Sequence, residues 1–177
     1  MKVKTSAPKC VRVLSIASLV LSVLWVVGYV VCVMLQREIR PLFVTDPTAI
    51  ELFYVPIAPI VENTVMLLFM LVTSILVLAF GEKKIWSNAF SITMLSVMSF
   101  LYLTRGILGS VVSTVETTML GRYGSAMLAA AATVNSTVGY ASLFFSAATV
   151  CMILALVILT YRCTLDRKAA RNGGYLV

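Results

Sequence analysis

Residues 63–104 read NTVMLLFMLVTSILVLAFGEKKIWSNAFSITMLSVMSFLYLT, and this stretch decides the fold. Two apolar runs without a charged residue, 63–81 and 85–104, flank the short connection Glu82-Lys83-Lys84. A helix rises ~1.5 Å per residue and the hydrocarbon core of a bilayer is ~30 Å thick, so each run is long enough to cross a membrane. Because so short a connection permits only a tight hairpin, we expect the two helices to be antiparallel neighbours.

Two further uncharged runs lie outside this hairpin, at 13–36 and within 123–161. Hydrophobic residues make up 60% of the 177 residues and charged residues 12%, and the mean hydropathy is +1.01. Such a composition requires a surface covered by lipid. We therefore predict an all-α fold, an integral membrane four-helix bundle that forms one domain over 13–161. The predicted spans are about 13–36, 59–80, 85–105 and 138–161.

The two tails, 1–12 and 162–177, and the hairpin connection carry most of the basic residues. An even number of spans places both tails, and the hairpin connection, on one side of the membrane. That side carries ten lysines and arginines, whereas the other side carries four. Positively charged flanks are retained in the cytoplasm, so we expect both termini to be cytoplasmic. The net charge of +7 then reflects topology and attraction to anionic lipids of the cytoplasmic leaflet, not binding to nucleic acid. We expect a multi-pass protein of the plasma membrane or endomembrane vesicles.

The two external segments differ in character. Segment 37–58 contains more charged residues and more prolines than the other external segment. Pro59, directly after it, suits the first turn of the second span. Segment 110–136 is unusually apolar for a loop and includes the run MLAAAA at 127–132, which consists of strong helix formers. We expect an interfacial helix there, or an outward extension of the fourth span.

Two ionisable residues, Glu62 and Arg105, lie at the ends of the second and third spans. Counted from Lys83 along each helix, they lie ~31 Å and ~33 Å away, at matching heights. One hypothesis is an interhelical ion pair, with or without Asn63 as a third member. A second has Glu62 stabilised by the helix macrodipole while Arg105 extends to water. A third assigns them to a transported ion or substrate.

The four cysteines are absent from both external segments. Structural disulfides form on the oxidising side of a membrane, so the chain lacks the loop disulfides typical of claudins, tetraspanins, connexins and innexins. Cys32 and Cys151 lie within spans, where packing is the expected role. Cys10 and Cys163 lie beside basic residues at the membrane edge, which makes them candidates for palmitoylation.

Catalysis finds no support in the residue types. The chain has no histidine and no Cys-x-x-Cys, and its seven acidic residues are scattered singly. The commonest general base and zinc ligand, the redox dithiol and a paired-carboxylate site are therefore lacking. We predict a protein that is not an enzyme, with no catalytic residues, no metal ligands and no cofactor.

Two modification or docking motifs remain. Asn135-Ser136-Thr137 is a glycosylation sequon on the predicted external side, directly before the fourth span. The C-terminus Tyr175-Leu176-Val177 has the hydrophobic-x-hydrophobic carboxylate end that PDZ grooves accept.

The fourth span is rich in small and aromatic residues, reading GYASLFFS at 139–146, and it ends at the basic exit Tyr161-Arg162. Together with the chain length, the expected cytoplasmic termini and the tight basic hairpin, this layout resembles the MARVEL group of tetraspan proteins. It covers roughly residues 10–165. The resemblance implies a role in membrane apposition, vesicle traffic or lateral organisation of lipids, without catalysis.

We therefore expect a non-enzymatic protein that organises membrane domains, vesicle traffic or a partner complex. Its expected partners are membrane lipids, other membrane proteins or further copies of itself. The alternative is a subunit of an oligomeric channel or small transporter, in which Glu62, Asn63 and Arg105 line a polar vestibule.

Overall fold

The computed structural model describes residues 9–81 and 86–172, and within these ranges the fold is helical with no strand. Four long helices are each apolar and long enough to span a membrane: α1 (Lys9–Met34), α4 (Ala58–Phe80), α5 (Asn88–Gly121) and α6 (Ser125–Asn172). Short helices α2 (Gln36–Ile39), η1 (Arg40–Leu42) and α3 (Pro47–Glu51) connect α1 to α4. The predicted all-α four-helix bundle is confirmed. Insertion into a membrane and the cytoplasmic placement of the termini stay predictions.

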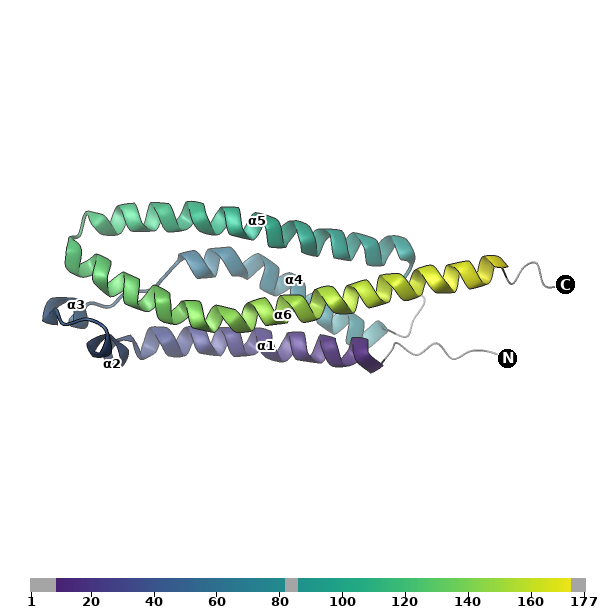
Figure 1. The fold of residues 1–177 in the computed structure, drawn as a ribbon, viewed down its shortest axis with the longest axis horizontal. Coiled ribbons are helices and arrows are strands. Elements are labelled where there is room, and N and C mark those ends of the chain that lie inside the picture. The colour runs from purple at the N-terminus through teal and green to yellow at the C-terminus, as the bar shows by residue number, and fades with distance from the viewer. Residues whose placement is uncertain (1–8, 82–85, 173–177) are drawn as a thin grey trace.

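The helices pack with α6 between α1 and α5 (Figure 1). Helices α4 and α5 are neighbours, as the short hairpin predicts, but α1 and α6 make the most extensive contact. That seam is close because Gly28 lacks a side chain: a Cβ built there would lie 3.2 Å from the Cβ of Ala141. Helix α1 begins and α6 ends at one end of the bundle, here called the terminal end (Figure 1).

Segment 110–136 is not a loop. Helix α5 continues through it to Gly121, and α6 begins at Ser125 after a turn in which Gly124 has φ of +102°, a backbone conformation that favours glycine. No helix end lies near residue 105, where the third span was predicted to end. Of the two expectations for this segment, the outward extension of the fourth span describes residues 125–137. The 34 residues of α5 and 48 of α6 correspond to about 51 Å and 72 Å of helix.

The interior toward the terminal end is rich in methionine. Met66, Met70, Met98 and Met152 are buried to 1% exposure or less, together with Phe145. The ring of Trp25 on α1 meets the ring of Phe145 edge-on at 5.4 Å. Flexible thioethers fill irregular gaps well, which suits methionine to this buried cluster.

The opposite end is closed by residues 35–57, here called the cap, which are organised around Arg40. This arginine is fully buried. Its Nη1 donates to the carbonyls of Ala49 at 3.1 Å and Ile50 at 3.3 Å, and its Nη2 donates to Oε1 of Gln36. The same Gln36 oxygen accepts from the backbone N–H of Tyr54 at 3.0 Å. Arg40 therefore ties α2, α3 and the segment before α4 together, although in the sequence it counts only as an external charge.

Candidate functional site

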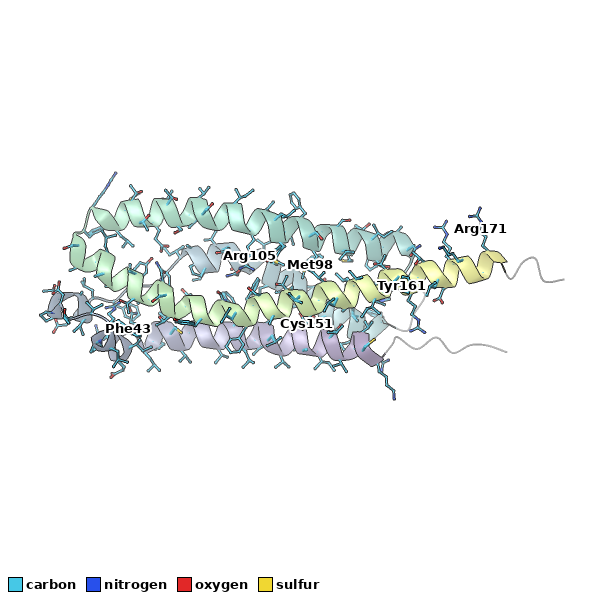
Figure 2. All side chains as sticks on the ribbon, viewed as in Figure 1. Phe43, Met98, Arg105, Cys151, Tyr161 and Arg171 are labelled. Atoms are coloured by element: carbon cyan, nitrogen blue, oxygen red, sulfur yellow. The ribbon has the colours of Figure 1, made fainter. Side chains whose placement is uncertain are left out.

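The structure brings Glu62 of α4 and Arg105 of α5 into an ion pair. Nε of Arg105 donates to Oε1 of Glu62 at 2.8 Å, and the side chains are 14% exposed for Arg105 and 26% for Glu62. Figure 2 shows Arg105 on the inner side of α5. Partial burial lowers the local dielectric, so the attraction exceeds that of a surface pair.

A glycine provides the space for the carboxylate. A Cβ built at Gly109, one turn beyond Arg105, would lie 2.7 Å from Oε2 and 2.8 Å from Cδ of Glu62. Such distances are shorter than any ordinary contact. Glu62 can therefore rest against the backbone of α5 only because residue 109 has no side chain.

Two aromatic rings lie close to the guanidinium group of Arg105. Cζ of Arg105 lies 4.7 Å from the ring centroid of Phe145 on α6 and 5.8 Å from that of Tyr102. The electron-rich ring faces attract a cation. Nη1 of Arg105 is buried and has no hydrogen-bond partner among the described residues.

Asn63 is adjacent to the pair but is not hydrogen-bonded to it. Its Nδ2 donates to the carbonyl of Pro59 at 2.8 Å. Its Oδ1 is buried and unpartnered within the described part of the chain, and the whole side chain is 1% exposed. The hydrogen bond to its own helix therefore fixes the orientation of the Asn63 amide, and the amide oxygen has no donor.

These groups line a polar cleft of about 240 Å³ between α4, α5 and α6. Its polar lining consists of Glu62, Asn63, Arg105, Ser113, Asn135 and Ser142. The last three were not predicted to belong to this site. Their spacing would have indicated a shared face, but only once the helix bounds are known. On α5, Arg105, Gly109 and Ser113 are four residues apart, and on α6, Asn135 and Ser142 are seven residues apart. Each set therefore lies on one face of its helix.

Asn135 was singled out as a glycosylation acceptor. In the structure it lies inside α6, half-buried and lining the cleft. A glycan attached there would have to leave through the cleft, so glycosylation stays a prediction that the geometry disfavours.

Glu116 of α5 caps the first turn of α4 at the rim of the cleft. Its carboxylate accepts from the N–H groups of Ile57 at 2.9 Å and Ala58 at 3.4 Å. These orphan amides are otherwise uncapped, since α4 has no side-chain cap of its own.

Burial, together with the nearby Glu116 carboxylate, raises the pKa of the Tyr54 phenol.

The remaining predicted residues lie elsewhere. Cys10 is exposed at the start of α1. Cys163 is half-buried near the end of the bundle, where its Sγ donates to the carbonyl of Trp86 at 3.3 Å and accepts from Oγ of Ser91 at 3.7 Å. Access for acylation therefore favours Cys10, and palmitoylation stays a prediction. Tyr175, Leu176 and Val177 lie outside the described residues.

Within 9–81 and 86–172, no group of three or more acidic, cysteine or histidine side chains is placed to hold a metal ion. No protein-family model, curated protein or solved structure matches this chain. Function must therefore be inferred from its own residues.

We expect Gly109→Ala to lower the free energy of unfolding by about 1–2 kcal/mol, because the new methyl group displaces the Glu62 carboxylate from Arg105. The matched control is Gly106→Ala, since a Cβ at Gly106 would meet nothing within 4 Å. Thermal unfolding of the purified protein in detergent measures both variants. Equal melting temperatures for the two would contradict the close packing of Glu62 on α5.

Proposed function

We propose that this protein is a non-enzymatic, multi-pass membrane protein that organises membrane domains, vesicle traffic or a partner complex through lateral contacts of its helices. The proposal includes the MARVEL-like layout noted in the sequence. It also includes cytoplasmic termini, with the basic terminal end facing anionic lipid.

The observation that carries the proposal is the peripheral position of α5. Only Ser91, Met98, Gly109 and Leu120 of its 34 residues are buried. Its exposed apolar side chains are Ile92, Val97, Phe100, Tyr102, Leu103, Ile107, Leu108, Val111, Val115 and Met119. In a membrane such a face is available to lipid or to another transmembrane helix.

The basic residues at the end of α6 support a lipid-facing role. Arg167, Lys168 and Arg171 are exposed, and Arg171 lies on the part of α6 that extends beyond the other helices (Figure 2). Each basic residue near an anionic leaflet contributes about 1 kcal/mol of attraction.

The experiment is cysteine cross-linking in native membranes. With Leu103→Cys on α5, we expect cross-linked adducts with a second copy or with another membrane protein. Val20→Cys on the exposed face of α1 and the unsubstituted protein, which retains its own four cysteines, are the controls. Adducts no stronger for Leu103→Cys than for these controls would contradict the proposal.

The cleft supports a second candidate, a subunit of an oligomeric channel or small transporter, because Glu62, Asn63 and Arg105 all line it. Against conduction, Met66, Met98 and Phe145 belong to one buried apolar cluster that offers no polar path toward the terminal end. Ion flux through reconstituted protein that is abolished by Glu62→Gln would support this candidate and would overturn the first.

A further inference from the structure

One face of α5 follows a heptad pattern. Its side chains recur at alternating steps of four and three residues, at Val97, Leu101, Thr104, Leu108, Val111, Val115 and Thr118. We call these positions the seam. Steps of four and three average about 3.5 residues, which is the repeat with which two helices wrap around each other in a left-handed coiled coil. Five of the seam residues are aliphatic and two are threonines, so the seam is suited to contact with another apolar helix.

The outer part of the seam has no partner helix within the chain. Val97 is 36% exposed, and Leu108, Val111 and Val115 are 44%, 57% and 53% exposed. These values are high for apolar side chains that repeat along one face of a helix. The seam is therefore open to a neighbour in the plane of the membrane.

An apolar groove of about 380 Å³ runs along the same face, between α4 and α5. Its lining includes four successive seam residues, Leu101, Thr104, Leu108 and Val111. On the other side of the groove, Val61 and Val65 of α4 are 36% and 60% exposed. A helix laid along the seam would fill this groove and would contact α4 as well. The added van der Waals contacts would stabilise the association.

The polar groups near the seam are already satisfied within the chain. Oγ1 of Thr104 donates to the carbonyl of Phe100 at 2.9 Å. The two charged residues of α5, Arg105 and Glu116, are not at seam positions. Arg105 is paired with Glu62 at 2.8 Å, and the Glu116 carboxylate accepts from backbone N–H groups at the start of α4. An apolar surface can therefore cover the seam without leaving the Thr104 hydroxyl or the Arg105 guanidinium without a partner there.

We propose that the seam joins α5 to α5 of a second copy of this chain in a parallel dimer. Copies inserted in one membrane by the same charge pattern have the same orientation, so their α5 helices run parallel. In a parallel two-fold pair each seam residue meets its own counterpart, and one sequence supplies both halves of the interface. This inference rests on the proposed lateral contacts of α5 and names the partner.

Cross-linking of one α5 to the other tests the seam. The full chain carries Leu108→Cys or Val115→Cys, two differently tagged copies are expressed together, and the membranes are oxidised. A disulfide forms only where two Cβ atoms come close. We expect dimers that contain both tags to form about tenfold faster for these variants than for Ser110→Cys, because heptad geometry brings only seam positions together.

Ser110 is the matched control because it is exposed on the same stretch of α5 but lies off the seam. The unsubstituted chain gives the background from its own four cysteines. Equal rates for the seam variants and Ser110→Cys, or adducts of the seam variants with other proteins only, would overturn the dimer. Leu103 also lies off the seam, so adducts of Leu103→Cys with another membrane protein would leave the membrane-organising role standing even if the dimer is wrong.

Energy transfer between donor-labelled and acceptor-labelled copies in lipid vesicles is a second measurement that needs no cysteine at the seam. Val111→Lys should abolish the transfer, because two lysines would meet at the centre of an apolar interface. Thr117→Lys should leave it unchanged, since Thr117 is exposed off the seam. If both lysine variants give the same transfer, the seam is not the interface.

Discussion

Arg40→Ala is expected to lower the free energy of unfolding by about 3–5 kcal/mol, the range for removing a large, fully buried side chain together with its hydrogen bonds. The substitution leaves the carbonyls of Ala49 and Ile50 without the donors they have at 3.1 and 3.3 Å. It also opens a cavity at the centre of the cap. We expect the cap to open while the methionine-rich interior at the other end remains packed.

Proteolysis measures this local opening. Phe43 and Phe53 in the cap are already exposed, so chymotrypsin cleavage there should be limited by backbone mobility and should accelerate in Arg40→Ala. Thermal unfolding in detergent supplies the accompanying loss of stability.

Arg37→Ala is the matched control, three residues earlier in the same segment. Arg37 is exposed, and its charge contributes to the lowered pKa of Arg40, after the larger effect of burial. Its removal should change stability by less than about 0.5 kcal/mol. If Arg37→Ala and Arg40→Ala are cleaved at the same rate, Arg40 does not organise the cap.

The hairpin and the Glu62–Arg105 pair were within reach of the sequence because both depend on local geometry. A tight connection forces neighbours, and helical rise alone places the two charges at equal heights. The burial of Arg40 could not be predicted from the sequence. An arginine in a loop next to a predicted span is ordinarily interpreted as an exposed charge that sets the orientation of the span in the membrane. Only the fold of 35–57 shows that backbone carbonyls surround it.

The full length of α5 was not within reach of the sequence for a related reason. The charge at position 105 marked the predicted end of the third span, whereas the helix continues to Gly121 and the charge pairs with Glu62 of the neighbouring helix. Beyond it, Thr114 Oγ1 donates to the Ser110 carbonyl at 2.8 Å and Thr118 Oγ1 to the Thr114 carbonyl at 2.7 Å. Hydroxyl groups satisfied within a helix do not interrupt it. The cleft could not be predicted either, because Ser113 and Asn135 lie in segment 110–136, which the sequence placed between the third and fourth spans without assigning its helical faces.

Exchanging the two charges tests the ion pair most directly. We expect Glu62→Arg alone and Arg105→Glu alone each to destabilise the protein by about 3 kcal/mol, because each leaves two like charges in a partly buried site. The double variant restores opposite charges and should recover about half of the loss, measured by thermal unfolding and by the monodisperse fraction in detergent.

Recovery should be incomplete because the surroundings of each position suit the natural residue. A glutamate at 105 would face the ring of Phe145, which the natural guanidinium approaches to 4.7 Å and whose negative face repels a carboxylate. An arginine at 62 would have to fit against Gly109, where the smaller carboxylate of Glu62 now lies. If the double variant is no more stable than the better single variant, the pair does not stabilise the bundle. The contacts of Arg105 with Phe145 and Tyr102 would then account for its position at this depth.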